Sequence, residues 1–540
     1  MEAWDVIVIG GGAAAMSAAI SASRGGSSTL MISPQALGSG DYSALDGIAA
    51  SLREATPKNH RDDTIKTGDF LSDQDITSER CAQAVRQVDL LERWGMVFRR
   101  DQDGLPRVVS GEGHSKARVV DSGDATRRNL QQILEEQCIK HGVVRRGEQA
   151  PLSLISSDQR INGIVVHDLD AGAISAIQSK AVIIADDGFQ GAWNRSHVGM
   201  GMDMVLRNGI SLKDMEFVTF SPLYVTGTNI RLPTGILADG ATLHQSDGTQ
   251  LEESENQNLA KIVGELGGAV LDARGLDESA DWWMQTAMIL SERANINIRT
   301  QVIPVEARPD HTIGGIPVDE HGRVIISKWS RWFTGLYAAG DASCSGFHGA
   351  SSVVGNRTLD SLTGGAAAGN HAAEWSSNNN FTGSENLSNS LEIIRAQVQD
   401  RLGVKGDVAN RIGPVVDRLS NLLNESLGLS RNSSGLIKLA EELESLLDEA
   451  ENIDVDDTSL LMNTNLQDTL NLQAAIRLSL VATRSAIERK ESRGDHVRAD
   501  YTERDDENHL HHQLVDIDGN IGELAIRKGR GSTWVLSPGV

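Results

Sequence analysis

A glycine-rich turn near the start of the chain has the residue types and spacing of a phosphate-binding site. The short, largely apolar run from Asp5 to Ile9 leads into it. The small residues that follow are Gly10, Gly11, Gly12, Ala13, Ala14 and Ala15. They fit a G-x-G-x-x-G pattern whose third position tolerates alanine, and such a turn lets the backbone at a helix start approach a pyrophosphate. The pattern predicts an adenine dinucleotide site, and the alternative is an ordinary glycine-rich turn between a strand and a helix.

The residue expected to contact the ribose of that dinucleotide is a serine. A second apolar segment, Thr29 to Ile32, ends at Ser33, where many such units carry an acid for the ribose hydroxyls. A serine hydroxyl can still donate and accept hydrogen bonds. Because the missing acid weakens an NAD interpretation more than an FAD one, we expect FAD.

A late strand followed by Gly-Asp strengthens the expectation of FAD. The run from Gly335 to Ala339 (GLYAA) is apolar and leads into Gly340 and Asp341. In this position Asp341 would bind the ribitol hydroxyls, and the start of the next helix would face the pyrimidine edge of the flavin. The alternative for Asp341 is a helix N-cap.

Composition and charge exclude several classes of function. Lys and Arg together number 50 and Asp and Glu 74, so the net charge is −24, which repels nucleic acid and anionic membrane surfaces. Three widely spaced cysteines form no CxxC pair, so this chain alone builds no zinc ribbon or iron–sulfur cluster, and we expect a cytoplasmic location. No apolar stretch approaches the roughly 20 residues of a membrane span, so we expect no direct membrane insertion.

The patterning changes twice along the chain. Short mixed elements between about residues 214 and 308 predict an insertion or cap. Apolar residues at three- and four-residue spacing from about 387 to 490 predict a helical region, and alternation near the end predicts a small β tail.

Taken together, these motifs resemble one family. The motifs on which the resemblance rests are the N-terminal DVIVIGGGAAA, LDGIAA (45–50), LERWG (91–95), KDMEF (213–217), IGGIP (313–317), GLYAAGD (335–341), HGA (348–350) and RKESRGDHVRADYTERDDEN (489–508). The chain resembles the flavoprotein subunit of succinate dehydrogenase and fumarate reductase, with L-aspartate oxidase as a relative. The resemblance covers nearly the whole chain.

The resemblance implies a fold and a function. The fold is α/β: a Rossmann-like FAD-binding domain (1–213 and 309–375) with an inserted α+β capping domain (214–308), then a helical domain (385–490) and a small C-terminal domain (491–540). The function is hydride transfer between flavin N5 and a small, carboxylate-bearing substrate. The implied partner is an iron–sulfur electron-transfer subunit, which would also hold the chain peripherally at the cytoplasmic membrane.

Several positions depart from the family pattern. Gly40 stands where the family has a histidine that can attach FAD covalently, so we expect FAD to be non-covalent. Ser351 and Ser352 replace the family's Asn-Arg, so the arginine that clamps a carboxylate is absent, and His311 is displaced by one position. Two alternatives therefore stay open: a flavin dehydrogenase or oxidase of the same fold on a different, less charged substrate, or a catalytically silent structural paralogue in a complex.

The candidate site residues follow from these matches and departures. The candidate catalytic residues are His311, Arg357 and Thr234. The candidate cofactor-binding residues are Gly10, Gly11, Gly12, Ala13, Ala14, Ala15, Ser33, Gly47, Asp341, Asn356, Arg357 and Thr358. The alternative for His311 is a structural hydrogen-bonding role, and for Arg357 a salt bridge to Asp360. No metal site is expected, because the histidines at 509, 511 and 512 lie in a charged, solvated loop.

Overall fold

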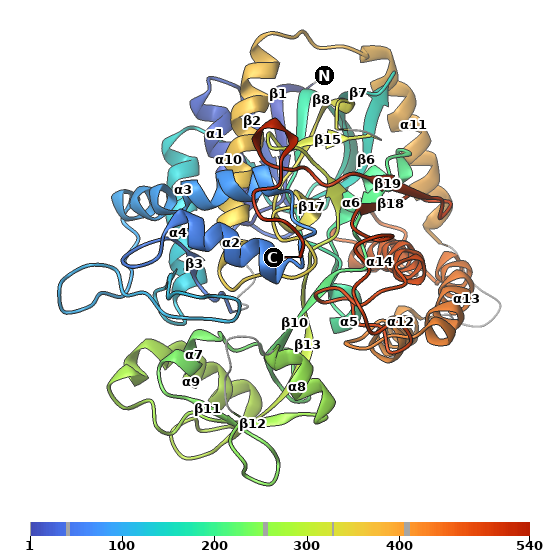
Figure 1. The fold of residues 1–540 in the computed structure, drawn as a ribbon. Coiled ribbons are helices and arrows are strands. Elements are labelled where there is room, and N and C mark those ends of the chain that lie inside the picture. Colours follow the sequence, from blue (N-terminus) through green and yellow to red (C-terminus); the bar gives the residue numbers. More distant parts are fainter. Residues whose placement is uncertain (1, 39–43, 252–257, 327–328, 404–410, 540) are drawn as a thin grey trace.

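A large, mostly parallel sheet forms the centre of the molecule (Figure 1). The computed structural model describes residues 2–38, 44–251, 258–326, 329–403 and 411–539. The sheet has eight strands in the order β15-β16-β7-β8-β1-β2-β5, with β6 paired to β7. The strands that matter for the site are β1 (Glu2–Ile9), β2 (Thr29–Ile32), β5 (Val144–Arg146), β8 (Ala173–Ile184) and β16 (Trp332–Ala338), which pair in parallel. Both faces of β1 are buried near its end, which explains its apolar run.

Helices cover one face of this sheet. They are α1 (Ala13–Arg24), α2 (Pro57–Thr67), α3 (Gln74–Trp94), α4 (Thr126–Lys140) and α10 (Asn356–Ser377). Helices α1 and α10 pack closely because glycines of α10 lie on α1: a Cβ added at Gly365 would be 2.3 Å from the carbonyl oxygen of Ala14. The strand–turn–helix–strand unit predicted from the sequence is therefore confirmed, and α1 begins directly after the glycines.

The inserted segment forms a lobe of its own, at the bottom of Figure 1. Its antiparallel sheet has the order β10-β13-β12-β11, formed by β10 (Val218–Val225), β13 (Ile303–Thr312), β12 (Ala269–Asp272) and β11 (Thr242–His244). Helices α7 (Gly235–Ala238), α8 (Leu259–Glu265) and α9 (Met284–Ile289) complete the lobe. Strands β10 and β13 join it to the rest of the molecule, and β13 continues past residue 308, the predicted domain boundary.

The last third of the chain is helical and then irregular. Its helices are α11 (Ser384–Arg401), α12 (Ile412–Ser426), α13 (Ser433–Glu451) and α14 (Thr464–Glu488). Strand β18 (His512–Val515) follows and pairs on one side with β19 (Ile521–Leu524) and on the other with β9 (Leu212–Lys213), which ties the tail to the start of the inserted lobe. The predicted α/β class is confirmed. None of the helices in the described ranges is long and apolar enough to cross a membrane.

Candidate active site

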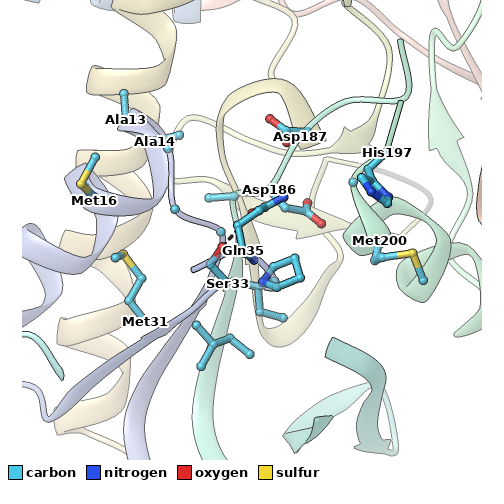
Figure 2. Close-up of a pocket in the computed structure, with 18 of the residues that line it drawn as sticks. Ala13, Ala14, Met16, Met31, Ser33, Gln35, Asp186, Asp187, His197 and Met200 are labelled. Atoms are coloured by element: carbon cyan, nitrogen blue, oxygen red, sulfur yellow. Dashed lines mark hydrogen bonds between the residues drawn. The ribbon is translucent and has the colours of Figure 1, made fainter. Parts of the chain in front are cut away.

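The glycine-rich turn lines a cavity of about 570 Å³, which we call the dinucleotide cavity. It lies at the carboxyl ends of β1 and β2. Gly10 has φ +129°, and a Cβ there would lie 2.1 Å from the carbonyl oxygen of Ala185, so only glycine fits. Figure 2 shows Ala13 and Ala14 on one side of this cavity and His197 with Met200 across from them.

The start of helix α1 gives this cavity an anion-binding end. Gly12 is the N-cap and offers no side-chain hydrogen bond, and the first turn contains no acidic residue. Its backbone N–H groups therefore keep their capacity for an anionic ligand, which the helix dipole also favours. Arg127 of α4 and Arg357 of α10 line the same cavity and add positive charge.

Asp341 and Arg357 both line the dinucleotide cavity and form an ion pair there. The Nε atom of Arg357 donates to Oδ2 of Asp341 at 2.9 Å. Burial raises the pKa of Asp341, but the Arg357 guanidinium outweighs burial and holds that pKa below its ordinary value. The alternative partner considered from the sequence, Asp360, instead lies 3.3 Å from Arg80, so the Arg357–Asp360 pairing is wrong.

Two further carboxylates line the dinucleotide cavity, where a diphosphate would repel them. Oδ2 of Asp186 accepts a hydrogen bond from the backbone N–H of Gly201 at 2.8 Å. Burial raises the pKa of Asp186 to about 7, so this carboxyl is partly protonated near neutral pH. The adjacent Asp187 is exposed. Figure 2 shows both side chains, and their protonation and exposure limit the repulsion of an anionic ligand.

A second, smaller cavity of about 80 Å³ lies between the sheet domain and the inserted lobe, and we call it the chamber. It meets the dinucleotide cavity at Leu45, Arg357 and Thr358, which line both. The charged residues that line the chamber are Asp46, Glu112, Arg231, Asp310, Arg357 and Asp495. These side chains come from six parts of the chain that lie far apart in the sequence.

Both arginines of the chamber are held between aspartates. Arg231 is ion-paired with Asp46 and, at 2.8 Å, with Asp310. Arg357 lies 3.9 Å from Asp310 and is paired with Asp341. The carboxylates therefore already use the guanidinium groups that a substrate carboxylate would need.

His311 lines the chamber with both ring nitrogens unsatisfied. His311 is 4% exposed to solvent, and neither its Nδ1 nor its Nε2 atom has a hydrogen-bond partner among the described residues. Burial, and then the nearby charge of Arg357, lower the pKa of His311 well below its ordinary value, so the imidazole is neutral. A neutral imidazole carries one donor and one acceptor, and leaving both unpaired in the interior is unfavourable. A ligand in the chamber would satisfy them.

Thr234 contacts a carboxylate of the chamber. Its backbone N–H and its hydroxyl donate to Oδ1 of Asp46 at 2.7 and 2.9 Å. Burial raises the pKa of Asp46, but Arg231 and these donors bring it below its ordinary value, so Asp46 is a carboxylate. Thr234 thus positions a charged group of the chamber.

The structure brings most of the sequence-predicted residues together. Those that line the dinucleotide cavity are Gly10, Gly11, Gly12, Ala13, Ala14, Ser33, Asp341, Arg357 and Thr358, and those that line the chamber are Gly47, Thr234, His311, Arg357 and Thr358. Ala15 and Asn356 line neither cavity. The amide of Asn356 is used by His60 and Thr64, at 2.7 and 2.9 Å. Gly40 lies outside the described residues.

Sequence reasoning missed several residues of the site. They are Asp46, Glu112, Arg127, Arg231, Asp310 and Asp495. Asp310 is adjacent to His311 and Asp46 lies within the LDGIAA motif, but their spacing in the sequence does not indicate that their charges meet in one cavity. In the inserted lobe, Lys261, Arg274, Arg293 and Arg299 do not line the chamber. Within the described residues, no three side chains of His, Cys, Asp or Glu meet as metal ligands.

Comparison with known proteins identifies the family. A family model described as an FAD binding domain matches residues 5–357, and one described as the fumarate reductase flavoprotein C-terminal region matches residues 416–532. The chain belongs to the succinate dehydrogenase and fumarate reductase flavoprotein family. It is an FAD-dependent oxidoreductase of that family, as the sequence predicted.

Individual relatives extend over most of the chain. The fumarate reductase flavoprotein subunit of Haemophilus influenzae is 27% identical over 521 residues, covering 87% of this chain and 84% of its own length. The succinate dehydrogenase flavoprotein subunit of Rickettsia felis is 27% identical and covers 97% and 94%. A solved variant of the quinol fumarate reductase subunit FrdA of E. coli has the same fold, with a TM-score of 0.91, 24% identity and coverage of 100% and 99%.

The residues of the dinucleotide cavity fit FAD. The open first turn of α1 suits a diphosphate, the Asp341 carboxylate suits hydroxyl groups, and Ser33 lies at the end of β2 where the adenosine ribose is expected. The cavity volume is also within the range of small-molecule sites.

Proposed function

We propose that this flavoprotein exchanges a hydride with a substrate that binds in the chamber and carries less negative charge than a dicarboxylate. The observation that carries the proposal is the pairing of Arg231 and Arg357 with aspartates. A dicarboxylate needs cations whose hydrogen-bonding groups are available to it, because its two charges must leave water. Displacing Asp46 or Asp310 from the arginines would leave a buried carboxylate unpaired, at a cost of about 3–5 kcal/mol.

The carboxylate-bearing substrate implied by the sequence stays a prediction. The geometry favours the less charged substrate that was its alternative. The supporting observation is local: both guanidinium groups that line the chamber are ion-paired with aspartates.

The cofactor, when bound, supplies the hydride acceptor or donor. The residues proposed to hold it are the glycines and alanines of the turn at 10–14, Ser33, Asp341, Arg357 and Thr358. We propose that it is held non-covalently. His311 is the group placed to hydrogen-bond the substrate, because its neutral imidazole has one donor and one acceptor that are both without a partner among the described residues.

An electron-transfer partner is also part of the proposal. Relatives are named as flavoprotein subunits, among them the 8-methylmenaquinol:fumarate reductase subunit of Wolinella succinogenes. We propose that this chain works in the cytoplasm with an iron–sulfur subunit, which would place it peripherally at the membrane. The domain boundaries given above remain proposals as well.

One anaerobic experiment tests the proposed function. The purified, FAD-loaded protein is photoreduced and mixed with fumarate while the flavin band at about 450 nm is followed. The reduced spectrum should persist, whereas the H. influenzae relative, run in parallel, should reoxidise. Fast reoxidation of this protein would show that the chamber accepts a dicarboxylate. A protein that takes up no FAD even when FAD is added would favour the silent structural paralogue.

A further inference from the structure

We propose that Asp186 takes up a proton when FAD binds, so that the affinity of the protein for FAD falls as the pH rises above neutrality. This inference concerns the cofactor and is independent of the substrate proposed for the chamber. It begins from the contrast between two aspartates of the dinucleotide cavity.

Asp341 and Asp186 line the same cavity but differ in their partners. Asp341 is ion-paired with Arg357, whereas no cationic side chain among the described residues pairs with Asp186. Oδ2 of Asp186 accepts from the backbone N–H of Gly201, and Oδ1 is shielded from solvent with no hydrogen-bond partner in the described part of the chain. A charge on Oδ1 would be stabilised neither by water nor by a donor, so the neutral carboxyl is favoured.

The other charged groups of the cavity leave this contrast in place. Those that line it with Asp186 are Arg127, Glu135, Arg145, Arg146, Asp187, His197, Asp341, Arg357 and Asp468. Of the cations, Arg145, Arg146, His197 and Arg357 are paired with other carboxylates. Burial, with a smaller contribution from the adjacent Asp187, raises the pKa of Asp186 to about 7 against the opposing effect of the Gly201 N–H. Asp186 of the free protein is therefore a mixture of the neutral and charged forms near pH 7.

FAD would bring further negative charge to this carboxyl group. Asp186 lies against the glycine turn, because a Cβ built on Gly10 would be 2.9 Å from the backbone nitrogen of Asp186. The diphosphate expected at the start of α1 is negatively charged. Asp186 is also partly exposed and lines the cavity, so a ligand that fills the cavity removes water from it. Both effects disfavour the carboxylate and raise the pKa of Asp186 in the complex.

The direction of the pH dependence follows from this increase. The complex holds more protons than the free protein at any pH between the two pKa values of Asp186. FAD therefore binds most tightly below about pH 7, the pKa of Asp186 in the free protein, and less tightly above it.

The wild-type protein tests the proposal without any substitution. The apoprotein is titrated with FAD by fluorescence at about pH 6.5 and about pH 8.5, and the dissociation constant should be about tenfold larger at the higher pH. Calorimetry at about pH 7.5, in two buffers of different ionisation enthalpy, should show uptake of more than about half a proton per FAD bound. An affinity that is constant or increases with pH would overturn the proposal, because an ionised Asp186 that accepts a hydrogen bond from the cofactor gives that result.

One substitution assigns the proton to Asp186. Asp186→Asn keeps an oxygen for the N–H of Gly201 but carries no charge at either pH. D186N should bind FAD with nearly the same affinity at both pH values, and about tenfold more tightly than the wild type at about pH 8.5. Its circular dichroism spectrum should match that of the wild type. A dissociation constant that still increases tenfold with pH in D186N would place the proton on another group and overturn the proposal.

His197 provides the matched control. Histidine titrates in the same pH range, and His197 lines the same cavity in an exposed pair with Asp468 at 3.7 Å. His197→Gln should keep the tenfold change with pH. Loss of that change in H197Q would assign the proton to the imidazole and overturn the proposal. A wild type that binds no FAD at either pH would overturn this inference together with the cofactor assignment, whereas the fumarate experiment above bears on the substrate of the chamber.

Discussion

The two cavities that meet at Arg357 and Thr358 are built in different ways. The dinucleotide cavity is shaped mainly by backbone: a glycine turn, the open start of α1 and the ends of parallel strands. The chamber is shaped by side chains from β10, β13, the segment at residue 46 and the C-terminal region. A backbone site leaves a contiguous signature in the sequence, whereas a side-chain site is assembled from residues far apart. The difference explains why the cofactor could be predicted and the substrate could not.

The largest expected effect is at the backbone site. Gly10→Ala would place a Cβ against the carbonyl oxygen of Ala185 at φ +129°, so we expect FAD to be lost and the free energy of unfolding to fall by about 4 kcal/mol. The measurements are the flavin-to-protein ratio and urea denaturation. Gly413→Ala is the control, because a Cβ there meets nothing within 4 Å and Gly413 lies on α12, outside the lining of the cavity. Full FAD occupancy in G10A would show that the backbone at Gly10 does not control cofactor binding, and the contrast between the two cavities would then fail.

The next effect is on the ion pairs of the chamber. Arg231→Met leaves Asp46 and Asp310 buried without their shared cation, so the free energy of unfolding should fall by about 3 kcal/mol. Arg195→Met removes an exposed ion pair with Asp417 and should lower it by less than about 1 kcal/mol. Urea denaturation measures the free energy of unfolding of both variants. If both lost the same amount, the buried ion pairs of the chamber would contribute no more to stability than the exposed pair.

A pH-dependent effect of about 3 kcal/mol is expected at Asp495. Burial raises the pKa of this carboxyl to about 6, above its value in the unfolded chain, so the folded protein loses stability as the pH rises from about 4 to 6. Asp495→Asn should therefore be more stable than the wild type at pH 8 by about 3 kcal/mol, and this gain should vanish near pH 4. Thermal or urea unfolding across this range measures it. A gain that does not change with pH would contradict the raised pKa.

The smallest effect concerns charge at the dinucleotide cavity. Arg127→Gln should weaken FAD binding about tenfold, or about 1.4 kcal/mol, because Arg127 lines the cavity and its charge opposes that of a diphosphate. The adjacent Arg128 is exposed and does not line the cavity, so Arg128→Gln is the control. Fluorescence titration of the apoprotein with FAD gives both affinities. A similar loss in both variants would indicate general attraction by surface charge.

Much of the fold could be predicted from local patterns. The run at 5–9, the glycines after it and the segment at 29–32 gave a strand, a turn and a second strand because each follows from the periodicity of a few neighbouring residues. The inserted lobe and the helical region were also expected. Strand β13 extends to Thr312, past the predicted boundary at 308, because pairing with β10 rather than composition decides where it ends.

The sequence by itself determined the family, the parallel sheet, the cofactor and the residues of the glycine turn. The tertiary structure alone decided which partners the charged and amide side chains have. It pairs Arg357 with Asp341 rather than Asp360, uses the amide of Asn356 for His60 and Thr64, and places Arg231 between Asp46 and Asp310. These outcomes depend on distances between residues that lie up to hundreds of positions apart, and electrostatic and hydrogen-bonding energies depend on those distances rather than on sequence spacing.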